Sequence, residues 1–276
     1  MLIYNTKKMV SRIRHLLQPF AWRIRSLFSA EVENPIIVLG NQKTGTTVIA
    51  ALIGQASGKQ VTLDFMHLYP TLTDRLLSGE LSFTDMRRKC RYHMNQQILK
   101  EPGLTLFCDD LCLAYPRSKI VLILRDPREN IRSILNRLKL RGDWEQIPEE
   151  EMCRLRMTVA PEWLMVLEGD RFGHAGKNYV DSLARRCAIC FNYALANRER
   201  FHIVRYEDFK EDKKNFIEGL CLELELDVSG DIQGLVDVQY QPKGASVDHL
   251  QFFGEENLAC IDAACLKYYK EFDYAE

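Results

Sequence analysis

The chain has 276 residues, and 46% of them are hydrophobic, which is enough to bury a large core at a length near the upper end for one domain. The formal net charge of −1 argues against a general nucleic-acid-binding protein, which is usually strongly basic. No Pro/Gly/Ser-rich linker and no repeat divides the sequence. We therefore expect a single α/β domain over residues 34–276, preceded by a basic segment over residues 1–33.

The basic N-terminal segment has an uneven charge, because its first thirty residues carry no acidic side chain and these basic ones: Lys7, Lys8, Arg12, Arg14, Arg23 and Arg25. Arginines interrupt its apolar residues, so it lacks the roughly 20 consecutive apolar residues of a membrane span. Pro19 and the arginines also spoil it as a signal-peptide core. Two interpretations remain: a helix packed on the flank of the domain, or an amphipathic segment lying on an anionic membrane. We expect the chain to stay in the cytoplasm, with or without such peripheral membrane contact.

Nine cysteines are present, and a reducing compartment would leave them as thiols. Cys187 and Cys190 form a C-x-x-C pair, but within a stretch of helical periodicity and without a second pair or histidines that would complete a zinc site. We expect these two thiols to be small buried side chains and predict no metal site.

Apolar runs bounded by turn residues predict the strands, and helical patterns separate them. The predicted strands are residues 36–39, 60–63, 119–124 and 202–205, with a weaker candidate at 105–108. The predicted helices are about 46–57, 83–99, 127–139, 180–198, 210–223 and 255–270. Such alternation favours right-handed βαβ crossovers, and hence a three-layer α/β fold with a mostly parallel central sheet flanked by helices. Residues 141–178 mix Pro and Gly with short helical pieces, which indicates an insertion that shapes a pocket or a cover.

The stretch "GNQKTGTT" links the first predicted strand to the first helix. The P-loop pattern G-x-x-x-x-G-K-[ST] places Gly40 and Gly45 correctly but requires Lys where Thr46 stands, and the nearby lysine is Lys43 inside the loop. Consecutive backbone N–H groups, hydroxyls and a helix N-terminus make an anion cradle. The alternative is an ordinary glycine turn with a threonine at the N-cap.

The stretch "KIVLILRDPRENIRSILNRL" predicts a buried strand that ends at Arg125 and a helix that starts at once. Asp126 suits the N-cap, Pro127 the first helical position, and Glu129 the third, which is a capping-box arrangement. Ser133 lies two helical turns along, on the face of the cap. An arginine fork with a hydroxyl suits a terminal phosphate monoester, although a capped helix with a surface arginine is the plainer interpretation.

These motifs resemble the cofactor-binding elements of the sulfotransferases that use 3′-phosphoadenosine 5′-phosphosulfate (PAPS). "KTGTT" after a strand and "RDPRENIRS" are similar to the two anion-binding elements, "HIVRYEDFKEDKKNFI" to the family's "RYEDL" segment, and "LKEPGLTLFCDDLCLAYPRSK" to its "KxP…L…FP" stretch. The order and spacing match from about residue 34 to 225. The resemblance implies a P-loop-like sulfotransferase architecture, with residues 141–178 shaping the site of the acceptor.

The resemblance also implies roles for particular residues. The 5′-phosphosulfate would be held by Lys43, Thr44, Gly45, Thr46 and Thr47. Arg125 and Ser133 would hold the 3′-phosphate, and Tyr206 would lie beside the adenine. A late basic-Gly segment, which closes over the 3′-phosphate in many members, corresponds to Lys243 and Gly244, although Pro242 replaces the usual arginine.

The position of Lys43 has a chemical explanation. A sulfuryl group in flight carries less negative charge than a phosphoryl group, so it can transfer without a metal ion. A lysine aimed at the bridging oxygen stabilises the charge that develops on the leaving phosphate.

The residue that takes the proton from the acceptor is left open by the sequence. In one family branch this base is the histidine of "KTH"; the lysine corresponds to Lys100, but Pro102 stands where the histidine would be. Another branch uses a glutamate at the end of the second strand, where this chain has Asp64, our first candidate, followed by His67, our second. Glu101 and His93 are weaker candidates. Lys100 would be a second cation on the leaving group or, alternatively, a solvated lysine. The alternative for Asp64 is a helix cap at the strand end, and the alternative for His67 is a polar surface residue.

Two other functions remain as alternatives to sulfuryl transfer. A P-loop kinase or NTPase would require lysine in place of Thr46 and an acidic Mg²⁺ ligand at a strand end. A catalytically inactive nucleotide-binding module would bind the 3′,5′-bisphosphate nucleotide without turnover. The acceptor is expected to be a small lipid-like or aromatic molecule, because the insertion supplies Trp163, Leu164, Met165, Leu167, Phe172, His174 and Tyr179. The alternative is that these side chains simply fill the core.

Overall fold

The computed structural model describes residues 31–69, 71–236 and 248–274. The basic N-terminal segment up to residue 30 and the pair Lys243 and Gly244 lie outside these residues, so the predictions made for them are not tested by it. No helix of the described residues is both long enough and apolar enough to span a bilayer.

A five-stranded sheet forms the centre of the fold, in the order β2-β3-β1-β4-β5, and all neighbouring strands are parallel. The strands are β1 (Ile36–Gly40), β2 (Val61–Leu63), β3 (Ile98–Lys100), β4 (Ile120–Leu124) and β5 (Phe201–Arg205). In register, Val38 of β1 lies between Lys100 of β3 and Val121 of β4. β1 and β4 are buried at every position, as expected for parallel strands covered on both faces.

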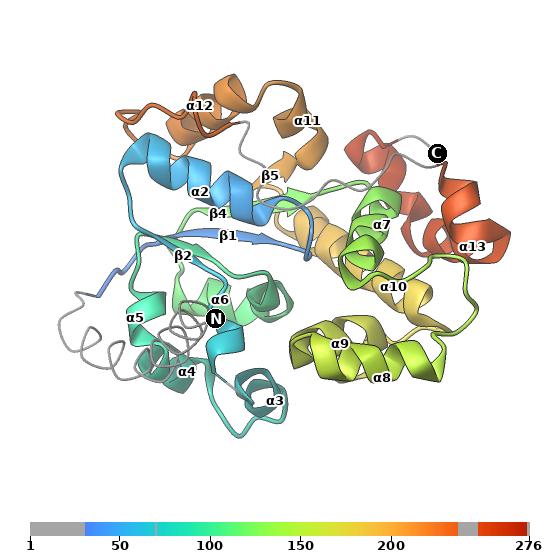
Figure 1. The fold of residues 1–276 in the computed structure, drawn as a ribbon. Coiled ribbons are helices and arrows are strands. Elements are labelled where there is room, and N and C mark those ends of the chain that lie inside the picture. Colours follow the sequence, from blue (N-terminus) through green and yellow to red (C-terminus); the bar gives the residue numbers. More distant parts are fainter. Residues whose placement is uncertain (1–30, 70, 237–247, 275–276) are drawn as a thin grey trace, which may run out of the picture.

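Helices cover both faces of the sheet, which confirms the predicted three-layer α/β architecture (Figure 1). Alternate β1 residues divide between two hydrophobic clusters. Ile36 and Val38 join α2 (Thr46–Ser57) and α12 (Lys213–Glu223) on one face. Ile37 and Leu39 join the larger cluster on the other face, which includes α6 (Cys108–Ala114), α7 (Pro127–Leu138), α10 (Tyr179–Ala196) and α13 (His249–Tyr269).

The remaining helices are short, and several belong to connections between strands. Between β2 and β3 lie η1 (Met66–Leu68), α3 (Leu72–Leu77), α4 (Phe83–Lys89) and α5 (Arg91–Met94). The segment predicted as an insertion holds α8 (Glu149–Thr158), α9 (Pro161–Glu168) and η3 (Asp170–Phe172). Of these, α9 packs against α10, and α8 and η3 pack against α9. The last helices are α11 (Tyr206–Glu211) and η4 (Lys270–Phe272).

Two predicted elements between β2 and β4 were wrong. The predicted helix 83–99 ends early, and its last residues form β3, because the run Ile98–Lys100 is buried between β1 and β2. The weaker strand at 105–108 is instead the 3₁₀ helix η2 (Pro102–Phe107) followed by α6. Glu101 caps η2 by accepting from Gly103 N, and Pro102 at the first position favours coiling over extension.

Helix ends account for the other differences. The helix predicted at 210–223 is two helices, broken at Asp212, whose side chain caps the second by accepting from Asn215 N. Asp126 is the N-cap of α7, as predicted, and accepts from the N–H groups of Arg128 and Glu129. The reciprocal half of the predicted capping box is wrong, however, because Asp126 N donates to Glu207 and not to Glu129. Glu129 has other partners, described below.

Candidate active site at the carboxyl ends of the strands

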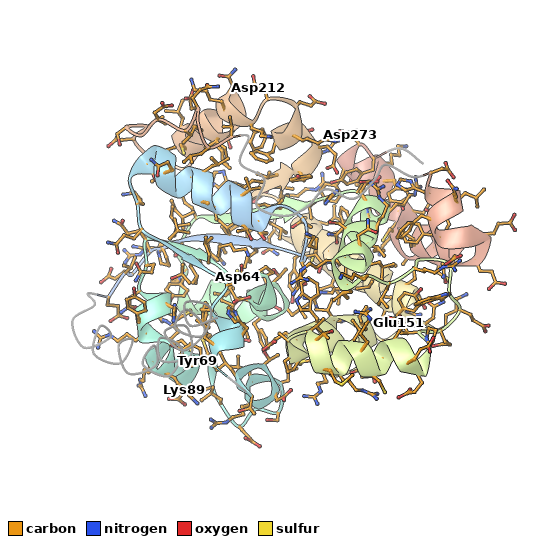
Figure 2. The ribbon with its side chains drawn as sticks, viewed as in Figure 1. Asp64, Tyr69, Lys89, Glu151, Asp212 and Asp273 are labelled. Carbon is orange, nitrogen blue, oxygen red and sulfur yellow. The ribbon has the colours of Figure 1, made fainter. Side chains whose placement is uncertain are left out.

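Each strand of the sheet is followed, at or just after its carboxyl end, by a predicted site residue. The loop containing Lys43 follows β1, Asp64 follows β2, Lys100 ends β3, Arg125 follows β4, and Tyr206 follows β5. Ligands of open parallel sheets bind beyond these ends, where the strand order reverses. Asp64 lies close to the centre of the molecule in Figure 2.

Residues 41–47, called the anion loop below, are fixed from two sides. Asn130 of α7 donates to the Gln42 carbonyl at 2.7 Å, and its Oδ1 accepts from Asn41 Nδ2 at 2.9 Å. Thr44 donates its hydroxyl and its N–H to the Asn41 carbonyl at 2.8 and 3.4 Å. Thr44 therefore shapes the loop, and any contact of its side chain with a ligand remains a prediction.

A buried arginine braces the anion loop from α10. Arg186 is 1% exposed, and its Nε donates to Asn41 Oδ1 at 2.8 Å, while Nη2 donates to Gln42 Oε1 at 2.9 Å. Its Nη1 is buried without a hydrogen-bond partner among the described residues, and the guanidinium lies over the Phe172 ring at 5.5 Å. Arg186 was not predicted from the sequence. Its position in register with the buried residues Leu183, Cys187 and Cys190 of α10 was the signal that could have found it.

Lys43 and Asp64 both have left-handed backbone conformations, with φ of 71° and 50°. Such conformations are unfavourable for residues other than glycine and are concentrated at functional sites. Burial, together with the nearby charges of Arg125 and Arg137, lowers the pKa of Lys43 to about 8. An anion bound close to Lys43 would favour its charged form.

Gly45 is the N-cap of α2, with φ of 92°. A Cβ at this position would lie 2.4 Å from Tyr206 Cδ2, so the loop and the Tyr206 ring are in direct contact. The Arg125 guanidinium covers the same ring at 4.8 Å, and Arg125 Nη1 donates to the Lys43 carbonyl at 2.9 Å. Loop, arginine and tyrosine, from three strand ends, therefore form one packed unit.

A buried lysine joins the anion loop to the predicted base. Lys100 is 2% exposed, and its Nζ donates to Thr47 Oγ1 at 2.8 Å and to Asp64 Oδ1 at 2.5 Å. Because the Thr47 oxygen accepts this bond, its own hydroxyl proton stays available for another acceptor. Lys100 is therefore a buried and hydrogen-bonded charge, and the alternative of a solvated lysine is wrong; its role as a second cation on the leaving group stays a prediction.

The weaker base candidates differ in their surroundings. Glu101 is buried and accepts from Phe65 N, Met66 N and Gly103 N at 2.8, 2.8 and 3.0 Å, so it fixes the turn that follows Asp64. Burial, with the Asp64 carboxylate next in importance, raises the pKa of Glu101. His93 is stacked on Phe65 at 5.5 Å, and burial lowers its pKa to about 4. These contacts give both residues structural roles, whereas His67 is exposed in η1.

The predicted 3′-phosphate residues belong to the segment of β4 and α7. Arg125 precedes the helix, and Ser133 is a partly exposed residue on it. Arg125 Nη2 donates to Glu129 Oε2 at 3.3 Å, and Arg125 Nε is buried without a hydrogen-bond partner among the described residues. Glu129 also binds Arg132 and His249, two basic residues that the sequence interpretation missed. No sequence signal connects His249 with α7, since 120 residues separate it from Glu129.

Of the seven residues predicted to line an acceptor pocket, three are buried and four, including Leu164 and Met165, are partly buried. Leu167, His174 and Tyr179 are buried, and Tyr179 donates its hydroxyl to the Arg141 carbonyl at 2.6 Å. Trp163 and Phe172 are partly buried and pack against the larger cluster. Cys187 and Cys190 are buried free thiols on α10.

Comparison with known proteins identifies the class. The model of the sulfotransferase family matches residues 62–230, more than half of the chain, so the chain belongs to the sulfotransferase family of transferases. A search of curated protein sequences found no significant match.

Two crystal structures illustrate the similarity of the fold. Sulfotransferase STF9 from Mycobacterium avium matches with a TM-score of 0.58 and 15% identity, over 94% of this chain and 82% of that one. Sulfotransferase STF1 from Mycobacterium tuberculosis H37Rv matches with a TM-score of 0.51 and 17% identity, over 90% of this chain and 81% of that one. At such low identities the two structures support the fold alone.

Proposed function

We propose that the chain transfers a sulfuryl group from PAPS to a hydroxyl or amine of an acceptor, in line and without a metal ion. One observation carries the proposal: the buried Lys100 ammonium bonds to both Thr47 and Asp64. Thr47, which suits the sulfate of the donor, and Asp64, which suits deprotonation of the acceptor, thus bind the same ammonium group. An in-line transfer needs these two functions side by side.

The residues present fit the two anionic ends of PAPS. Lys43, the Gly45 N–H and the hydroxyls of Thr46 and Thr47 would hold the 5′-phosphosulfate. Arg125 would hold the 3′-phosphate with Ser133. Its buried Nε has no hydrogen-bond partner within residues 31–69, 71–236 and 248–274, which is consistent with a ligand completing this site. Tyr206 would lie beside the adenine, and the bound PAPS supplies the activated sulfuryl group.

Each charged side chain then has a chemical task. Lys43 stabilises the negative charge that develops on the leaving phosphate, where a preorganised cation is most effective. Asp64 takes the proton from the acceptor, with His67 as the second candidate. Lys100 holds the Asp64 carboxylate in place at 2.5 Å and is near enough to Thr47 to contact the sulfuryl oxygens as a second cation.

The acceptor is proposed to be a small lipid-like or aromatic molecule bound beside the insertion. The partly buried Trp163, Leu164 and Phe172 support this proposal, because their remaining exposed apolar surface is available to a ligand. Peripheral membrane contact through the basic N-terminal segment stays a further proposal.

An acceptor screen tests the function. Purified protein with PAPS, in EDTA, is incubated with a panel of phenols, long-chain alcohols, sterols and amines, and formation of adenosine 3′,5′-bisphosphate (PAP) is measured. We expect acceptor-dependent PAP formation that Asp64→Asn reduces at least a hundredfold, a loss typical of a general base. PAP binding without turnover would favour an inactive nucleotide-binding module, and Mg²⁺-dependent ATP turnover would favour a P-loop kinase.

A further inference from the structure

Three basic side chains from three parts of the chain converge on one carboxylate. Glu129 Oε2 accepts from Arg132 Nη2 at 2.7 Å and from Arg125 Nη2 at 3.3 Å, and Glu129 Oε1 lies 3.0 Å from His249 Nε2. The four side chains are only 12–29% exposed. Arg125 follows β4, Arg132 lies on α7, and His249 is the first residue of α13.

The Glu129 carboxylate binds the arginine that is assigned to the 3′-phosphate. Arg125 is assigned to the 3′-phosphate, and Ser133, assigned with it, lies one helical turn beyond Glu129. Arg125 cannot donate both terminal nitrogens to the phosphate while Nη1 is bonded to the Lys43 carbonyl and Nη2 to Glu129. A dianion arriving here would also be repelled by Glu129, since like charges a few ångströms apart in a partly buried site interact strongly.

We propose that Glu129 is an internal substitute for the 3′-phosphate: it holds Arg125, Arg132 and His249 together in the ligand-free protein, and the 3′-phosphate displaces it on binding. This inference rests on the proposed function, because it presupposes a donor nucleotide at this edge of the sheet. Glu129 then contributes to donor specificity, since a nucleotide without a 3′-phosphate cannot replace Glu129 as the partner of these three basic side chains. Arg132 and His249 join Arg125 and Ser133 as ligands of the phosphate.

The exchange replaces one anion by another. The pKa of Glu129 is lowered to about 2 by its hydrogen bond to His249 and then by its contacts with Arg132 and Arg125. This carboxylate is therefore ionised at neutral pH. Removing the charge of Glu129 should therefore free Arg125, Arg132 and His249 for the phosphate, without adding a contact to the rest of the nucleotide.

Glu129→Gln tests the inference by calorimetric titration with PAP and with adenosine 5′-phosphate. We expect PAP to bind about tenfold more tightly to E129Q than to the wild type, and adenosine 5′-phosphate to bind within twofold of its wild-type affinity. Glu151→Gln is the matched control. Glu151 also pairs with an arginine three residues on, Arg154, at 2.5 Å, but on α8, away from Asp64 in Figure 2. Arg154 donates to the Leu138 carbonyl at the carboxyl end of α7, nine residues after Glu129, so E151Q should leave both affinities unchanged.

A second variant keeps the test decisive if E129Q does not fold, which thermal denaturation reports. Arg132→Gln should weaken PAP binding about tenfold and leave adenosine 5′-phosphate unaffected. If the wild type binds PAP but E129Q binds it equally or less tightly, or if R132Q has no effect on PAP, the inference is wrong and the proposed function stands. If the wild type does not bind PAP at all, the proposed function fails and the inference fails with it.

Discussion

Gly45→Ala should disrupt the contact between the anion loop and Tyr206. The substitution adds a methyl group that meets Tyr206 Cδ2 and Cε2 at 2.4 and 2.5 Å, at a residue with φ of 92°. Ring contacts with the Arg125 guanidinium and with Phe209, at 4.8 and 5.9 Å, oppose a shift of the tyrosine. The left-handed conformation costs a non-glycine residue about 1–2 kcal/mol, and overpacking adds about 1–3 kcal/mol, so we expect a total loss of about 2–5 kcal/mol.

Urea denaturation of Gly45→Ala and of a matched glycine variant measures the two contributions separately. Gly58, at the other end of α2, has φ of 65°, and an added Cβ there would have Ser229 Oγ at 3.9 Å as its nearest neighbour. Gly58→Ala should therefore lose only the backbone part, about 1–2 kcal/mol. In the double variant Gly45→Ala/Tyr206→Ala the overpacking part should disappear, which a double-mutant cycle detects as a coupling of about 1–3 kcal/mol. If Gly45→Ala costs no more than Gly58→Ala and the cycle shows no coupling, the packed unit of loop, arginine and tyrosine does not exist as described.

The other predictions concern the charged groups. Lys43→Ala should reduce kcat far more than PAP affinity, because the lysine acts mainly on charge that develops in the transition state; equal losses measured by steady-state kinetics and calorimetry would refute that role. Because the pKa of Lys43 is lowered to about 8, its ammonium is lost as the pH rises through 8, so kcat/KM should fall above about pH 8; this decline should be absent in Lys43→Arg, and an unchanged decline would assign it to another group. Arg125→Ala should weaken PAP binding at least tenfold but hardly affect adenosine 5′-phosphate, and an equal loss for both nucleotides would remove Arg125 from the 3′-phosphate site.

The elements with strong local patterns were predictable from the sequence. α2 has the predicted bounds, because Gly45 and Gly58 mark both of its ends and an apolar face lies between them. The buried runs of β1 and β4 identified the centre of the sheet. β3 was missed because Ile98 and Leu99 continue the helical pattern predicted for 83–99, whereas their pairing between β1 and β2 makes them extended.

The site was predictable where residues directly follow strands and not where distant segments meet. Lys43, Asp64 and Arg125 follow predicted strands, so the parallel topology alone brings their backbones to one edge. Lys100 was a candidate because it corresponds to a lysine of the family motif. Its bonds to Thr47 and Asp64 could not be predicted, because they depend on β3 lying between β1 and β2. The Glu129–His249 contact joins α7 to α13 over a long sequence separation, which no local pattern indicates.

The central claim is that the anion loop and the start of α7 bind a 3′,5′-bisphosphate nucleotide without a metal ion. Calorimetric titration of the purified protein with PAP in EDTA, with ATP as competitor, tests it most directly. We expect tight binding of PAP that ATP cannot match. Failure to bind PAP, or binding only of Mg²⁺–ATP, would contradict it and place the loop with those of the P-loop enzymes.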